Sequence, residues 1–105
     1  MATGDAPVLE ALAAINAVSL GRTELDPRSL MLVRLAALIA VDAPASSYLL
    51  HVAPAAEAGL TVDDAEDVLV AVAPIVGTPR TAAAAVKIVE ALDLTIQLVL
   101  GEDEE

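Results

Sequence analysis

Apolar residues recur along this chain at the three- and four-residue spacing of α-helices, and we expect five helices and no strands. A first amphipathic helix is predicted over residues 7–20, ending before Gly21. A second is predicted over residues 27–41, because Asp26 is a favourable N-cap and Pro27 suits the first turn. This second helix is apolar on almost all sides, so we expect it to be the central and most buried one.

Three further helices are expected in the second half of the chain. One covers residues 42–59, opened by Asp and Pro, with Gly59 just past its end. The next covers residues 61–77, and its Thr61-Val-Asp-Asp opening is a capping arrangement. The last starts at residue 78 and runs through an Ala-rich stretch, as far as residue 100. The predicted fold class is all-α.

The composition suits one domain over residues 1–105, but it contains more apolar side chains than one small core can hide. Hydrophobic residues make up 57% of the chain, against about 45–50% in ordinary domains. Residues 30–41 form the longest apolar stretch near the middle, and Arg34 interrupts it. That is short of the ~18–20 residues that span a membrane, and the N-terminus lacks the basic region of a secretory signal. We therefore expect contacts between copies of the chain, in a soluble cytoplasmic protein without a membrane partner.

Charge and cysteine content exclude several classes of function. The formal net charge is −11, from 16 acidic and five basic residues, so nucleic acid is an improbable partner. The absence of cysteine excludes disulfides, thiolate metal sites and thiol redox chemistry. The acidic tail, residues 101–105, is expected to be a solvated end, with docking on a basic partner as the alternative.

The stretch SSYLLHVAPAAEAG, residues 46–59, holds the only histidine and the only tyrosine. Ser47 and His51 are four residues apart and share a helical face with Tyr48, so a small pocket is possible there. Three interpretations stay open for His51: a histidine satisfied by a backbone carbonyl at a subunit interface, a ligand or substrate residue, or a metal ligand. A metal site would need three copies meeting at a three-fold axis, because one chain has no second His or Cys. Pro54 marks either a kink that frees a carbonyl beside the imidazole or a simple helix boundary.

Arg34 lies in the most apolar predicted helix, where an unpaired charge would be costly. It is expected to pair with one of the acids Glu57, Asp64 and Asp67, or with a carboxylate of a neighbouring subunit. The alternative is that Arg34 binds a substrate carboxylate, a task for which Arg28 and Arg80 are also candidates.

An ordered set of motifs over residues 25–95 resembles the carboxymuconolactone decarboxylase family, which includes the alkyl hydroperoxidase D-like proteins. The motifs are D-P-R opening a buried helix, a histidine in the next helix, H-x3-A-x3-G-L-T before an acidic helix start, and V-G-T-P before an Ala-rich helix. The resemblance implies an alkyl hydroperoxidase D-like five-helix fold that assembles as a homotrimer or homohexamer. It also implies one of two chemistries, thiol peroxidase activity or decarboxylation of a carboxylated muconolactone.

The chain departs from both family patterns. The two cysteine positions of the peroxidase motif hold Pro44 and Ser47, and the upstream glutamate position falls at Met31 or Leu32. A serine hydroxyl cannot replace a redox thiol, so thiol peroxidase activity is not expected. Decarboxylase-type members commonly have an acid two residues before the histidine, and here that position is Leu49.

Two functions remain open. The first is a cysteine-free decarboxylase or isomerase for a small carboxylated metabolite, needing no metal or cofactor, with a carboxylate or lactone as its ligand. His51 would be the acid–base group and Ser47 would orient it, while Tyr48, Arg34 and Arg80 would contact the substrate. The alternative is a non-catalytic member that serves as an oligomeric assembly or binds a small ligand. A cavity that holds both His51 and an arginine would favour the enzyme.

Overall fold

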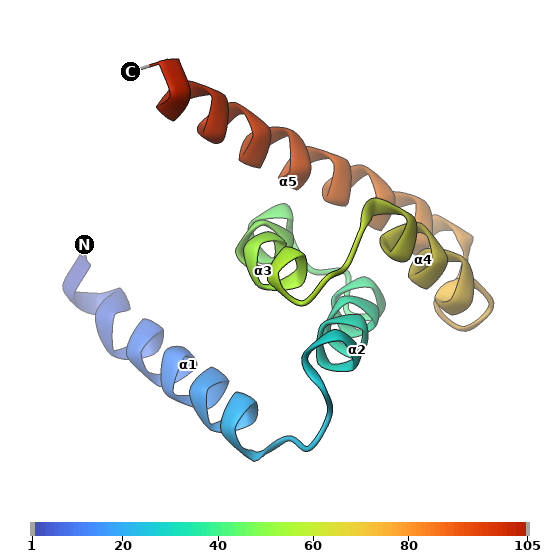
Figure 1. Cartoon of the computed structure of the whole chain (residues 1–105). Helices are drawn as coiled ribbons and strands as arrows, with labels where there is room; N and C mark the ends of the chain where they lie inside the picture. Colours follow the sequence, from blue (N-terminus) through green and yellow to red (C-terminus); the bar gives the residue numbers. More distant parts are fainter. Residues whose placement is uncertain (1, 105) are drawn as a thin grey trace.

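The computed structural model describes the backbone of residues 2–104 and the side chains of residues 6–98. It contains the helices α1 (Ala2–Arg22), α2 (Pro27–Ala40), α3 (Ala45–Glu57), α4 (Val62–Val76) and α5 (Thr78–Glu104), and no strand occurs among these residues (Figure 1). The all-α prediction with five helices is confirmed. The acidic tail, residues 101–105, is predicted to be a solvated end, and its side chains lie outside the described ones.

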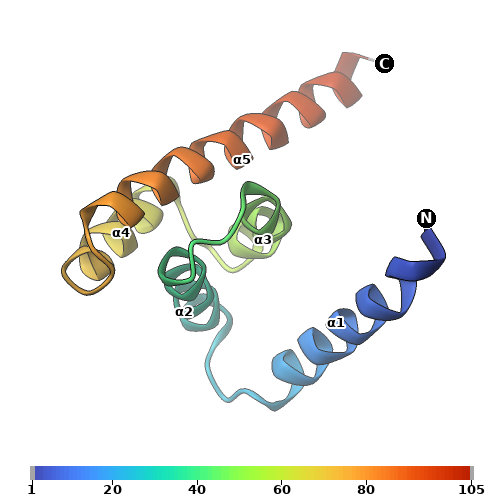
Figure 2. The same cartoon turned by 180° about the vertical axis from the view of Figure 1, so that it is seen from behind.

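Helices α2 to α5 pack together, and α1 stands apart from them (Figures 1 and 2). α3 packs on α5 and α2 on α4, and α2 also touches α3 and α5. The centre of this packing is a small core of aliphatic side chains and one aromatic ring, with Ile39 fully enclosed. Its buried members are Ile39, Ala43, Tyr48, Ala84 and Ala91.

The expectation for the second helix is met on one side only. α2 buries Leu30, Met31 and Ile39, the largest buried set of any helix among the described side chains. Its other side is open, since Val33 is 54% exposed. α2 is therefore central to the packing without being covered all round.

Local capping explains where α2 and α4 begin. The Asp26 carboxylate accepts a hydrogen bond of 3.1 Å from the Ser29 N–H, and Pro27 occupies the first turn. At α4, Thr61 and Asp64 bond to each other's backbone N–H groups at 2.8 and 3.2 Å, which is the predicted capping box.

The end of α3 also follows the prediction. Gly59 adopts a φ of 90°, a left-handed conformation that glycine accepts without a side-chain clash. The Leu60 N–H bonds to the Ala55 carbonyl and the Gly59 N–H to the Ala56 carbonyl, both at 3.0 Å. These two hydrogen bonds form a Schellman motif, and the chain turns sharply there from α3 into α4.

The start of α3 differs from the prediction. Pro44 is the N-cap, without a side-chain hydrogen bond, and Asp42 does not cap the helix. Asp42 instead takes a φ of 57° and forms an ion pair of 2.8 Å with Lys87 of α5. A local pattern cannot reveal this partner, because Lys87 lies 45 residues further along the chain.

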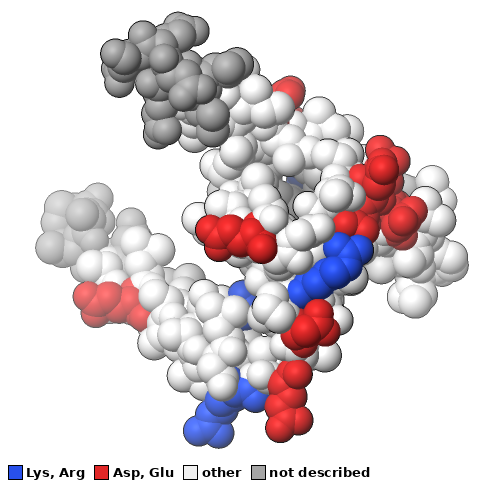
Figure 3. Space-filling view, viewed as in Figure 1, with Lys and Arg blue, Asp and Glu red and all other residues white. Residues whose placement is uncertain are grey.

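Helix α1 exposes its large apolar side chains. Ile15, for example, is 65% exposed, and most of the described surface of α1 is uncharged (Figure 3). The exposed set comprises Val8, Leu9, Leu12, Ile15, Val18 and Leu20. Across the described part of the chain, none of the helices combines the length and apolar character required to cross a membrane.

The acidic partners predicted for Arg34 within the chain are wrong, and a carboxylate of a neighbouring subunit stays a prediction. Arg34 donates to Asn16 Oδ1 at 2.6 Å and to Ser19 Oγ at 2.9 Å, both on α1, rather than to Glu57, Asp64 or Asp67. The prediction assumed that α2 was enclosed by the other helices. Arg34 is half-buried on α2, and the polar groups that reach it there are neutral side chains of α1.

Candidate functional site

A cavity of about 130 Å³ lies among α2, α3, α4 and α5, and His51 is on its wall. We call it the His51 cavity. Its lining includes Met31 and Leu35 of α2, Val52 of α3, Leu60 before α4 and Ile88 of α5. Apart from His51, Tyr48 and Thr61, the lining residues are all apolar, with no Asp, Glu, Lys or Arg among them.

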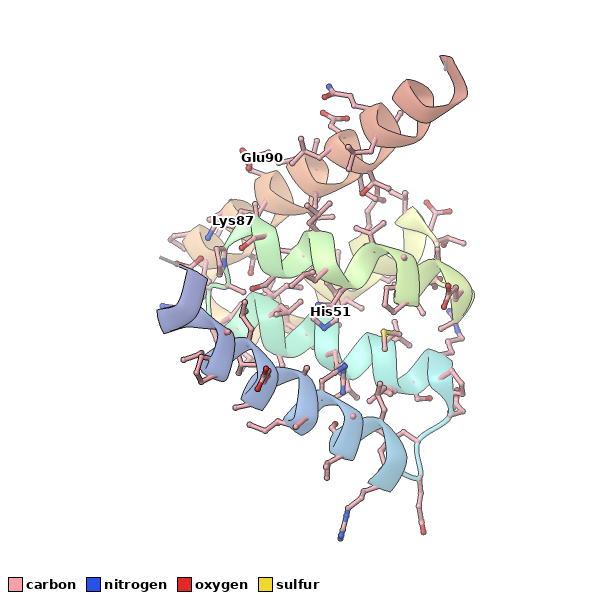
Figure 4. All side chains as sticks on the ribbon, turned by 90° about the vertical axis from the view of Figure 1, so that its left-hand side faces the viewer. His51, Lys87 and Glu90 are labelled. Atoms are coloured by element: carbon pink, nitrogen blue, oxygen red, sulfur yellow. The ribbon has the colours of Figure 1, made fainter. Side chains whose placement is uncertain are left out.

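The hydrogen bond of His51 determines its tautomer. Nδ1 of the imidazole lies 2.8 Å from the carbonyl oxygen of Ser47, one helical turn earlier. A carbonyl oxygen can only accept, so Nδ1 carries the proton, and in the neutral ring Nε2 bears the lone pair. The half-buried imidazole projects from α3 toward α2 (Figure 4). His51 therefore offers a proton acceptor at Nε2.

The backbone of Ser47, and not its side chain, holds the imidazole. Ser47 is not among the residues that line the His51 cavity. α3 continues through Pro54 to Glu57, so the predicted helix boundary at Pro54 is wrong, and the kink stays a prediction. The carbonyl beside the imidazole is that of Ser47, which a proline at position 54 does not affect.

Tyr48 forms part of the cavity wall and belongs to the core. Its side chain is only 4% exposed, and its hydroxyl is buried with no hydrogen-bond partner among the described residues. Burial raises the pKa of the Tyr48 phenol, and the negative charge of Asp42 raises it further. The ring therefore stays neutral and supplies an apolar surface, while the enclosed hydroxyl faces away from water.

The three candidate arginines do not line the cavity. Arg34 is bonded to α1, and Arg80 donates to the Ala40 carbonyl at 2.9 Å. Arg28 forms a two-pronged ion pair with Asp64, with bonds of 2.6 and 3.0 Å. Within the described residues, the structure thus brings His51 and Tyr48 together at one cavity but places no arginine there.

Arg28 has a positioning role that the sequence did not suggest. Besides its ion pair with Asp64, Arg28 donates to the Gly59 carbonyl at 3.2 Å, and so ties α2 to the turn that precedes α4. Residues 60–62 of that turn form one side of the His51 cavity. The hydrogen bond from Arg28 holds the pKa of Asp64 well below its usual range, with a further contribution from the Thr61 N–H.

Most of the cavity wall could not be predicted from the sequence. Leu35, Ile88 and Leu92 lie on two helices far apart in the chain, and nothing distinguishes these apolar residues from core residues before the helices are placed. Met31 drew notice only as one of two positions for the upstream glutamate of the peroxidase motif. No group of three or more His, Cys, Asp or Glu that could hold a metal ion exists in the described part of one chain.

Comparison with known proteins identifies the family. Neither the curated proteins nor the solved structures include a significant match to this chain. The family model described as "Carboxymuconolactone decarboxylase family" matches residues 6–91, which include all of α2, α3 and α4. The family's fold is the alkyl hydroperoxidase D-like helical domain that the sequence motifs predicted, and the chain has no cysteine with which to build the peroxidase motif. The chain belongs to the carboxymuconolactone decarboxylase family.

Proposed function

We propose that this protein binds a small molecule in the His51 cavity and that His51 acts there as an acid–base group, in decarboxylase-like or isomerase-like chemistry. One observation carries the proposal: an imidazole on the wall of an apolar cavity has Nδ1 bonded to a carbonyl, which leaves Nε2 as a proton acceptor. Histidine is suited to proton transfer near neutral pH. The mostly apolar wall also gives the reacting group surroundings of low polarity.

The other candidate residues take supporting roles in this proposal. The Ser47 carbonyl orients the imidazole, and the Tyr48 ring forms part of the wall. Arg34 and Arg80 are bonded to α1 and to the end of α2. The cavity therefore lacks the arginine that we expected in an enzyme for a carboxylated substrate, and such a substrate would need to keep its carboxylate outside the cavity.

The test is an NMR titration of the single histidine, whose signal needs no assignment because the chain has only one. The spectrum is recorded with and without a panel of small carboxylates, lactones and phenols. A saturable, ligand-dependent shift supports the site. A histidine signal that no member of the panel shifts would contradict the proposal.

A second candidate function, oligomeric assembly, rests on α1. Leu9, Leu12 and Ile15 are each more than half exposed, and within the described residues α1 has side-chain bonds to α2 but no helix packing against α2 to α5. Covering such side chains with another copy contributes about 1.5–3 kcal/mol for each one fully buried. We propose that the chain forms a homotrimer or homohexamer through this surface.

Light scattering after gel filtration tests the assembly. The wild type is expected at three or six times the chain mass, and Leu12→Glu with Ile15→Glu should shift it toward the monomer. Ser46→Glu, an exposed position in the first turn of α3, is the matched control that adds charge away from α1. A wild-type monomer at micromolar concentration would overturn this candidate and leave the cavity proposal intact.

A further inference from the structure

We propose that the occupant of the His51 cavity is an uncharged molecule of about one ring that presents a hydrogen-bond donor, the hydroxyl of an enol or phenol, to Nε2 of His51. The inference rests on the proposed function, because it names the ligand class of that same site. It favours proton transfer over loss of carbon dioxide, since a ligand of this class has a proton to give and no carboxylate to lose.

The size of the cavity limits the ligand. Its volume is about 130 Å³. In another protein, an engineered apolar cavity of about 150 Å³ binds benzene. One five- or six-membered ring therefore fits, and any larger substituent must extend through the open side.

The wall of the cavity disfavours a charged ligand. Apart from His51, no acidic or basic side chain lines it, and burying an unpaired carboxylate beside a neutral imidazole is strongly unfavourable. Arg28 beside the Gly59–Thr61 turn is already neutralised by Asp64 at 2.6 Å. The net charge of −11 adds a long-range repulsion of anions.

The remaining polar atoms determine what the ligand must offer. The Thr61 hydroxyl donates to Asp64 Oδ2 at 3.1 Å and accepts from the Asp64 N–H at 3.2 Å, so its donor is used. The Tyr48 hydroxyl is enclosed. Among the described lining residues, this leaves Nε2 of His51, which is an acceptor because Nδ1 donates to Ser47. A ligand that satisfies this atom must be a donor.

Three ring compounds of similar size separate these requirements: phenol is neutral with a donor, anisole is neutral without one, and benzoate is charged. Calorimetry at pH 8, where histidine is ordinarily neutral, measures their binding to the wild-type protein. One neutral hydrogen bond is worth about three- to tenfold in affinity, so phenol should bind tighter than anisole by that ratio. Benzoate should bind at least about tenfold more weakly than phenol, because its charge would be buried unpaired.

A variant pair assigns the difference to His51. His51→Phe keeps a ring of similar size and removes Nε2, so phenol should bind it no tighter than anisole. Ser46→Ala, an exposed neighbour on α3, should retain the wild-type ratio. Should His51→Phe fail to fold, His51→Leu, which also removes Nε2, replaces it.

Each outcome decides a separate point. A preference for phenol over anisole that is lost in His51→Phe or His51→Leu supports the inference. Equal binding of phenol and anisole would overturn the need for a donor, and tighter binding of benzoate would overturn the uncharged class. Both results would leave the proposed binding site standing. Failure of all three compounds to bind, together with an unshifted His51 signal across the larger NMR panel, would overturn the proposed function as well.

Discussion

Replacing Arg34 by methionine tests how α1 is held against the rest of the chain. Arg34→Met removes hydrogen bonds of 2.6 Å to Asn16 Oδ1 and 2.9 Å to Ser19 Oγ. Both partners are exposed and can bond to water in the variant, so each lost bond should cost about 0.5–1.5 kcal/mol. We expect a total loss of about 1–3 kcal/mol for the two bonds. Breaking one side of a buried ion pair would instead cost about 3–5 kcal/mol.

Urea denaturation followed by circular dichroism measures this loss, at one fixed protein concentration because assembly would add to the stability. The Asn16→Ala/Ser19→Ala variant, made in the wild type and in Arg34→Met, completes a cycle whose coupling energy should be about 1 kcal/mol. Arg22→Met is the control, since it removes an exposed arginine from the last residue of α1. A loss of 3–5 kcal/mol would refute the neutral-partner account and point to a carboxylate supplied by another subunit.

Three further predictions concern the core and the cavity wall. Tyr48→Phe should raise the free energy of unfolding, measured by urea denaturation, by about 1 kcal/mol, because it removes a buried hydroxyl that has no hydrogen-bond partner among the described residues. A clear decrease in that free energy would reveal a partner of the hydroxyl. Ile39→Ala should lower the free energy of unfolding by about 3 kcal/mol, since Ile39 is 0% exposed. Ile75→Ala, at a position that is 87% exposed, should lower it by less than about 1 kcal/mol. Equal losses would show that Ile75 is covered in an assembly. Arg28 lowers the pKa of Asp64, so the ionised Asp64 stabilises the fold at pH values above the ordinary carboxyl pKa, and this stabilisation is lost as the pH falls through the lower pKa of the folded state. The Tm of the wild type should therefore fall more steeply below pH 4 than the Tm of Asp64→Asn. Parallel curves of Tm against pH would contradict this.

The parts of the fold that could be predicted from the sequence depend on residues close together in the chain. Asp26 with Ser29, and Thr61 with Asp64, are three residues apart, so a capping pattern identifies both pairs. Gly59 likewise marks the end of α3 through its own backbone freedom. These signals are sufficient to place helix ends.

The features that could not be predicted depend on how the helices are arranged. The partners of Arg34 lie on α1, whose position relative to α2 no local pattern determines. The Lys87–Asp42 ion pair joins residues 45 positions apart. An expectation based on burial alone therefore assigned Arg34 to acidic partners it does not contact.

The sequence was sufficient to predict His51 as the centre of the candidate site, but not the groups that surround it. His51 attracts attention because it is the only histidine, and a partner four residues earlier follows from helix geometry. That the partner atom is the Ser47 carbonyl, and not its hydroxyl, depends on the side-chain rotamer. The lack of an arginine in the cavity depends on bonds that draw Arg28, Arg34 and Arg80 elsewhere.

The central claim, that His51 presents a free acceptor to a ligand, is tested most directly by the ¹⁵N NMR signals of its imidazole at pH 8. We expect the tautomer with the proton on Nδ1, bonded to the Ser47 carbonyl, and an unprotonated Nε2. Added phenol should move the Nε2 signal and leave the Nδ1 signal nearly unchanged. A proton on Nε2 in the neutral ring, or an Nε2 signal that phenol does not move, would contradict the account.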